Sequence, residues 1–119
     1  MPHVIVEGPA SIERFYQEFT PMFLREGETI IKIRDVYLSA GKRKVLIDCI
    51  VVEDRLAHPF YVAMSQKDAG ITVCLDPLTD PEKIDGVKRA LAILGHSLKL
   101  QDSACRYGKH NLTGFLIDD

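Results

Sequence analysis

The stretch that decides the fold is residues 45–76, VLIDCIVVEDRLAHPFYVAMSQKDAGITVCLD. Successive side chains of a β-strand point to opposite faces, so each apolar run in this stretch presents two different surfaces. One surface is strongly apolar in all three runs and suits a hydrophobic core: Val45, Ile47, Cys49, Val51, Phe60, Val62, Met64, Ile71, Val73 and Leu75. We therefore expect three consecutive strands that turn one face to a core.

The opposite surface of the same strands mixes polar and apolar side chains. It carries Leu46, Asp48, Ile50, Val52, Tyr61, Ala63, Ser65, Thr72, Cys74 and Asp76. This set is too polar for a core and too apolar to stay wholly in water. We expect the mixed surface to contact a partner or a ligand, with the binding residues Asp48, Ile50, Tyr61, Thr72 and Asp76.

The segment before the deciding stretch predicts a strand and then a helix. Residues 3–7 predict a short strand, and apolar side chains at helical spacing over 12–23 predict an amphipathic helix. Pro21 lies inside that spacing, so we expect it to kink or end the helix, with a loose turn after it.

Residues 29–38 predict the next strand. Its alternation changes parity near Arg34 and Asp35, which indicates a β-bulge at that point. A hairpin turn at 40–41 leads into the deciding stretch, where residues 54–59 predict a loop.

A second helix follows the deciding stretch. Residues 79–82, TDPE, have the pattern of a helix N-terminus, and Gly95 is expected to end the helix. Gly86 lies inside the helix and indicates close packing against the sheet, because glycine otherwise weakens a helix by about 1 kcal/mol relative to alanine. The expected buried stripe consists of Ile84, Val87, Leu91 and Leu94.

The element order is therefore β-α-β-β-β-β-α, with one further C-terminal strand near 98–100 or 114–117 as an alternative. Runs of sequential strands form hairpins, which predicts a mainly antiparallel sheet. We expect an α+β fold: a four- to five-stranded sheet with two helices on one face, in a single domain over residues 1–119.

Composition narrows the function classes. The net charge is −2 over 119 residues, which lacks the basic footprint of a nucleic-acid-binding protein. No apolar run approaches the roughly 18–20 residues that span a bilayer, and no signal peptide is recognisable, so we expect a cytoplasmic protein without membrane contact. The three cysteines and four histidines show no metal-ligand spacing, so we expect no metal, no cofactor and reduced thiols.

Two groups of charged residues invite a chemical interpretation. Residues 42–44, Lys-Arg-Lys, follow Gly41 but lack the remaining positions of a phosphate-binding loop. They predict a charged hairpin tip, with a weak anion site as the alternative. Asp48 lies in mid-strand, where a carboxylate must be paired, hydrogen-bonded or hydrated. It is expected to face solvent on an open sheet, to pair across a dimer interface with a residue such as Arg34 or, if desolvated, to act as an acid or base.

The opening residues 1–7, MPHVIVE, resemble the start of 5-carboxymethyl-2-hydroxymuconate isomerases in the tautomerase superfamily. The resemblance implies a cofactor-free trimer in which the amine of Pro2, exposed by removal of Met1, is the catalytic base. Arginines bind the substrate carboxylates in that family, and Arg34 is the candidate here because of its position in a strand. The likeness stops after the first strand–helix step, because we expect two consecutive hairpins where the family has one.

The sequence thus predicts a small binding or assembly domain that uses the mixed surface. Self-association into a homo-oligomer is the leading interpretation, because a half-apolar sheet face suits an isologous interface. Contact with a small acidic or polar ligand is the second, in a cup between the second helix and the sheet near Tyr61 and Asp48. The tautomerase with Pro2 as its base is the third.

Overall fold

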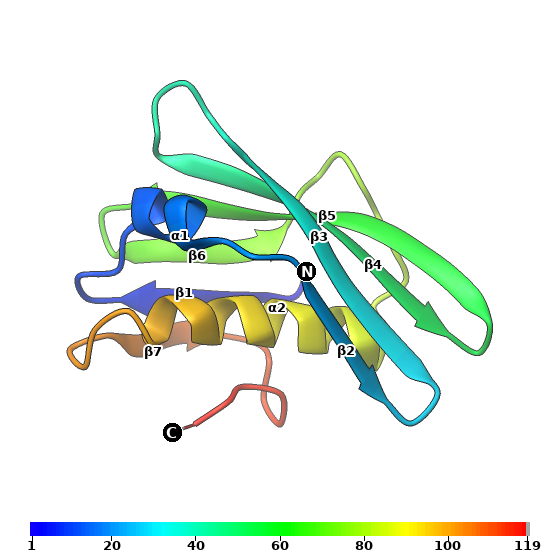
Figure 1. Ribbon diagram of the computed structural model, residues 1–119. Helices are drawn as coiled ribbons and strands as arrows, with labels where there is room; N and C mark the ends of the chain where they lie inside the picture. Colours follow the sequence, from blue (N-terminus) through cyan, green and yellow to red (C-terminus); the bar gives the residue numbers. More distant parts are fainter. Residues whose placement is uncertain (119) are drawn as a thin grey trace.

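The computed structural model describes residues 1–118, and one seven-stranded sheet organises them. The sheet order is β2-β3-β4-β5-β6-β1-β7, and every neighbouring pair is antiparallel. Two helices complete this α+β fold, as Figure 1 shows. The strands are β1 His3–Glu7, β2 Met22–Glu26, β3 Thr29–Leu38, β4 Lys44–Glu53, β5 Leu56–Lys67, β6 Gly70–Leu75 and β7 Arg106–His110; the helices are α1 Ile12–Glu18 and α2 Asp85–Lys99.

The prediction of a four- to five-stranded sheet with two helices on one face is wrong. Seven strands pair within residues 1–118, and the sheet curls into a half-barrel (Figure 1). Strand twist accumulates across a sheet of this width, and the bulge in β3 adds to it. Helix α2 packs against β1, β3, β4 and β6, whereas the short α1 packs against β3, β4 and β5.

The predicted apolar surface forms the core. All ten of its side chains are buried, and most have no exposed area at all. Val4 and Val6 of β1 and Val87, Leu91 and Leu94 of α2 join the same cluster. The alternation in the deciding stretch therefore identified the inner face of the central strands correctly.

The first helix is shorter than its apolar spacing predicts. Ser11 caps its start by accepting a hydrogen bond from the Arg14 N–H at 3.1 Å, and the helix ends at Glu18. Residues 22–26 then form the edge strand β2 in place of the expected loose turn. Met22 packs partly against the core, but the remaining residues of β2 are exposed, so the strand has no buried alternation to reveal it.

The predicted bulge in β3 is confirmed. The β3–β4 register shifts between Ile33 and Asp35, which changes the parity of the strand. The expected loop at 54–59 is wrong, because β4 and β5 are joined by a tight turn at Asp54 and Arg55. Both turn residues have positive φ, of 53° and 66°, the backbone conformation that two-residue hairpins favour.

Helix α2 begins and ends later than the sequence predicts. Its first residue is Asp85, and it continues through Gly95 to Lys99. Gly86 confirms the expected close packing: a Cβ there would lie 2.5 Å from Cγ1 of Val51 on β4. The last strand is also displaced, because β7 forms at Arg106–His110 and neither predicted C-terminal segment is a strand.

Candidate functional site

The mixed surface of the sequence forms the outer side of the central strands. We call it the outer face and define it by Tyr37, Leu46, Asp48, Ile50, Tyr61, Thr72 and Cys74. Tyr37 is exposed, and the other six are partly buried. Their inner neighbours, by contrast, are almost fully buried. The outer face therefore lies at the surface of the molecule and holds the side chains that the sequence singled out.

Cross-strand pairing brings two of the predicted residues together. Asp48 on β4 is the register partner of Tyr61 on β5. Ile50 lies opposite Pro59, one position beyond this pair on the same face, and Thr72 lies opposite Ser65 at the other end of β5. The predicted binding residues are thus spread over one surface. The expected cup between the second helix and the sheet is wrong at this place, because α2 packs against the inner side chains and not against the outer face.

Asp48 forms an ion pair with Arg34, but within one chain and not across a dimer interface as the sequence suggested. An Nη2 of Arg34 lies 2.8 Å from Oδ1 of Asp48 within the same chain. The Arg34 side chain is 47% exposed and that of Asp48 is 23% exposed. An ion pair with this much hydration contributes little to folding, about 0–1 kcal/mol. Both groups therefore remain available for contact with another molecule.

Asp76 is the one predicted binding residue that is buried. Its Oδ1 accepts a hydrogen bond from the Leu78 N–H at 2.9 Å, which fixes the turn after β6. Its Oδ2 lies 3.5 Å from Nζ of Lys44. Lys44 belongs to β4 and Asp76 follows β6, so this ion pair spans β5, where Ala63 is only 3% exposed. Asp76 therefore holds the turn after β6 and connects that turn to β4.

Tyr37 is a member of the outer face that the sequence interpretation missed. It lies opposite Leu46, and its side chain is 52% exposed. The signal was present, because the bulge at Arg34 and Asp35 places Tyr37 on the mixed side. A shallow cavity of about 220 Å³ lies beside it, lined by Tyr37, Leu38, Ser39, Lys44 and Leu46.

The phenols and carboxylates of the outer face lie on neighbouring strands, where Asp48 is paired with both Asp35 and Tyr61. The pKa of Tyr37 is raised, chiefly because the Asp35 carboxylate disfavours the phenolate, with smaller effects from lost hydration, Tyr61 and Asp48. A phenol that stays protonated can donate a hydrogen bond to a partner. The arrangement of two tyrosines, two aspartates and Arg34 suits recognition by hydrogen bonds and ion pairs.

The two strand cysteines lie on opposite faces, as expected from their parity. Cys49 points into the core, where burial and then the Asp48 charge raise the pKa of its thiol to about 12. Cys74 lies on the outer face, where burial and Asp76 raise its pKa. All three cysteines are free thiols. Thiols with raised pKa values are poor nucleophiles near neutral pH.

The two residues of the tautomerase hypothesis lie apart. Pro2 is buried at the start of β1. Arg34 lies in β3, and β4, β5 and β6 separate those two strands in the sheet. The carbonyl oxygen of Met1 accepts a hydrogen bond from Nδ2 of Asn111 at 2.8 Å, which fixes the chain before Pro2.

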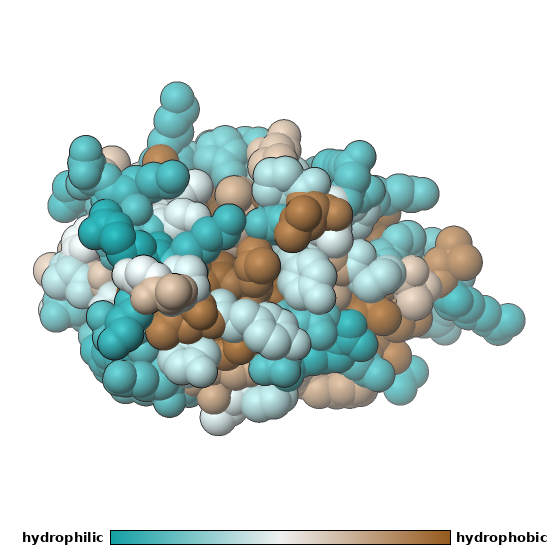
Figure 2. Space-filling view, turned by 90° about the horizontal axis from the view of Figure 1, so that it is seen from above, coloured by the Kyte–Doolittle hydropathy of each residue, from teal (hydrophilic) through white to brown (hydrophobic). Residues whose placement is uncertain are grey.

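Apolar side chains are also visible on the surface as a whole. Figure 2, seen from the top of Figure 1, shows them in several separate spots, across the middle and toward the right side of a mainly hydrophilic surface. Neither helix in residues 1–118 has both the length and the apolar content needed to cross a membrane. In the same residues, no group of three or more histidine, cysteine, aspartate or glutamate side chains is placed to hold a metal ion.

The chain shows no significant match to any family model, curated protein or solved structure.

Proposed function

We propose that this chain is an assembly domain that pairs with a second copy of itself through the outer face. The observation that carries the proposal is the contrast between the two sides of the central strands. The inner side chains are almost fully buried against the helices. The outer ones, Leu46, Ile50 and Tyr61 among them, remain partly in water.

The chemistry of the outer face fits an interface. Tyrosine and arginine are enriched where proteins meet, and aliphatic side chains supply the buried centre of such contacts. Tyr37 and Arg34 are about half exposed and flank the aliphatic Leu46 and Ile50. A covering copy would remove these side chains from water without changing the fold.

Charge complementarity favours a copy of this chain as the partner. The outer face carries one ion pair from Arg34 to Asp48 and a second from Lys44 to Asp76. In a two-fold arrangement the same patch meets itself, so Arg34 or Lys44 of one copy can face Asp48 of the other. Sheets that pack face to face lie about 10 Å apart with their strands at roughly 30°. The expected assembly is a two-layer sandwich of outer faces.

The test is sedimentation equilibrium of the wild-type chain and of Ile50→Glu at micromolar concentration. We expect a wild-type dimer and a variant whose dimer dissociation constant is raised roughly 30-fold or more, because the new carboxylate would be buried without a partner. Leu100→Glu is the matched control, since Leu100 is 59% exposed and follows α2 outside the outer face.

Thermal unfolding of both variants separates assembly from folding. Ile50→Glu should keep a cooperative unfolding transition, because Ile50 is outside the core. A strictly monomeric wild type at micromolar concentration, or equal weakening by Leu100→Glu, would refute the proposal.

A further inference from the structure

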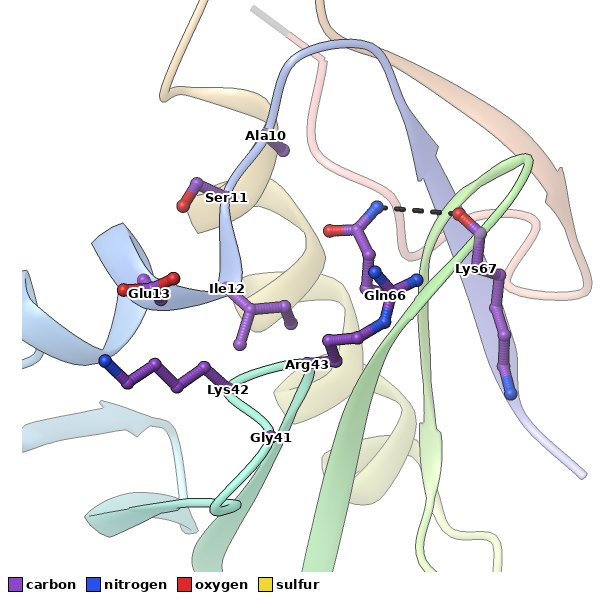
Figure 3. Close-up of a pocket in the computed structure, with 9 residues that line it drawn as sticks. All are labelled: Ala10, Ser11, Ile12, Glu13, Gly41, Lys42, Arg43, Gln66 and Lys67. Carbon is purple, nitrogen blue, oxygen red and sulfur yellow. Dashed lines mark hydrogen bonds between the residues drawn. The ribbon is translucent and has the colours of Figure 1, made fainter.

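A second region of the surface, separate from the outer face, combines a cavity with unpaired cations. The cavity has a volume of about 620 Å³ and is lined by Ala10, Ser11, Ile12, Glu13, Gly41, Lys42, Arg43, Gln66 and Lys67 (Figure 3). This volume is within the range of small-molecule sites, about 300–1,000 Å³. It is an open depression between the start of α1 and two hairpin ends.

Strand pairing brings the two hairpin ends together. The Gln66 N–H donates to the Arg43 carbonyl at 2.8 Å, so the β4 and β5 ends are hydrogen-bonded to one another. The β3–β4 turn is closed by Lys42 N–H to the Ser39 carbonyl at 2.9 Å. Lys42 has a φ of 61°, so this turn holds a lysine in a conformation that favours glycine.

The cations of this cavity are not neutralised. Among residues 1–118, the side chains of Lys42, Arg43 and Lys67 form no salt bridge. The neighbouring Lys44, by contrast, is paired with Asp76. Three unpaired cations on adjacent hairpin ends form a local positive field in a chain whose net charge is −2. That field attracts anions.

Figure 3 shows how these side chains are directed. The Lys42 ammonium points toward the Glu13 carboxylate, and the Arg43 guanidinium lies beside the Gln66 side chain. Lys67 points to the far side of Gln66, whose Nε2 donates to the Lys67 carbonyl at 3.5 Å. The Arg43 guanidinium therefore lies at one end of the cavity, and the Glu13 carboxylate lies with the Lys42 ammonium at the other.

We propose that this cavity binds a small organic phosphate that carries hydroxyl groups, such as a sugar phosphate. The forked guanidinium of Arg43 can hold a phosphate through two parallel hydrogen bonds. The Gln66 amide can donate a further bond. Glu13, which would repel a bare anion, accepts hydrogen bonds from hydroxyl groups on the opposite end of such a ligand.

Ser11 supports the hydroxyl end of the site. Its Oγ accepts from the Arg14 N–H at 3.1 Å, which leaves the hydroxyl proton free to donate. The position of Ser11 is fixed further by Gln101, whose Oε1 accepts from the Ser11 N–H at 2.7 Å. Cation, carboxylate and hydroxyl thus lie around one depression, which distinguishes the site from a simple basic patch.

The experiment measures binding to the full chain by calorimetry at low salt, with ribose 5-phosphate, inorganic phosphate and ribose as probes. We expect ribose 5-phosphate to bind more tightly than inorganic phosphate and ribose not to bind. Arg43→Gln should weaken ribose 5-phosphate about tenfold, which is the size of one lost charge-assisted hydrogen bond. Lys109→Gln is the control, because it removes an exposed charge on β7.

The variant Glu13→Gln distinguishes a site that recognises both ends of the sugar phosphate from unspecific attraction of anions by the positive charges. The variant should bind inorganic phosphate several-fold more tightly, because a repelling charge is lost, and should reduce the preference for ribose 5-phosphate. Absence of binding at millimolar ribose 5-phosphate, equal losses in Arg43→Gln and Lys109→Gln, or an unchanged preference in Glu13→Gln would each overturn the proposal.

Discussion

Gly86 of α2 lies directly against Val51 of β4, so closely that an added Cβ would be 2.5 Å from Val51 Cγ1 and 3.3 Å from Thr29 Cγ2. Both neighbours are side chains on strands of the central sheet. The absent side chain of Gly86 therefore sets how near the first turn of α2 can approach β3 and β4.

The first prediction concerns this contact. Gly86→Ala should lower the free energy of unfolding by about 1–3 kcal/mol, because overpacking outweighs the gain of about 1 kcal/mol in helix propensity. Chemical denaturation measures the effect. The double variant Gly86→Ala/Val51→Ala should be less destabilised than the sum of its two single changes, and a stabilised Gly86→Ala would show that the helix can move away.

The second prediction concerns the buried Asp76. Asp76→Ala should destabilise the fold by about 1–3 kcal/mol, because it removes the acceptor of the Leu78 N–H and leaves Lys44 without its partner. Asp76→Asn should cost less, since an amide oxygen can still accept from Leu78. Asp48→Ala is the comparison, with an expected loss of no more than about 1 kcal/mol. Equal losses of unfolding free energy for Asp48→Ala and Asp76→Ala would contradict the expectation that the buried carboxylate matters more for stability.

The third prediction concerns alkaline pH. The folded-state pKa of Cys49 is about 12, above the ordinary value of 9.0, so the folded chain holds this proton more firmly than the unfolded chain. The resulting stability is fully present below about pH 9 and is lost as the pH rises toward 12. The slope is at most about 1.4 kcal/mol per pH unit for one proton.

Denaturation curves between pH 8 and pH 11 measure that slope. The wild type should lose stability more steeply than Cys49→Ala, whose lower absolute stability does not affect the comparison of slopes. Cys74→Ala should resemble the wild type more closely, because Cys74 is less buried than Cys49. Identical slopes for the wild type and Cys49→Ala would be the contrary result.

The fourth prediction tests the resemblance of the first seven residues to the tautomerase superfamily. That resemblance predicts removal of Met1, which intact-mass measurement detects, and turnover of a 2-hydroxydienoate by the wild type but not by Pro2→Ala. A retained Met1 rules out Pro2 as the base, because its nitrogen would then be an amide.

The sequence predicted the centre of the sheet well because burial there follows strict alternation. Residues 45–51 alternate between buried and partly buried, as their apolar pattern required. The bulge at Arg34 and Asp35 was visible as a change of parity and is present in the register. The pattern also placed Asp48 and Tyr61 on one face, but their direct cross-strand pairing is seen only in the structure.

The edges of the sheet could not be predicted in this way. Strand β2 is almost wholly exposed, and Met22 and Phe23 extend the helical spacing of the residues before them. Strand β7, RYGKH, has no apolar alternation and pairs only with β1. Their place is decided by hydrogen bonds to a neighbouring strand, which leave little trace in local hydrophobicity.

Because of Pro59, the sequence did not predict the first residues of β5. Proline is unsuited to a central strand because it lacks an N–H, so it indicated a loop. In the structure β5 is bordered by β6 only from Val62 onward, so Pro59 lies where the strand has a single neighbour, β4. The prediction that Gly95 ends α2 is also wrong. A Cβ at Gly95 would lie 3.0 Å from Val4 Cγ1, so this glycine permits close packing of the helix and does not end it.

The position of β1 between β6 and β7 has a consequence for how the chain acquires its structure. The His3 N–H donates to Oδ1 of Asn111, 108 residues later. During synthesis β1 is made first, but it cannot pair with β7, the second of its two neighbours in the sheet, until the last strand has been made. Folding should therefore reach completion only after residue 111 has left the ribosome, and a nascent chain halted earlier should remain sensitive to protease along residues 3–7.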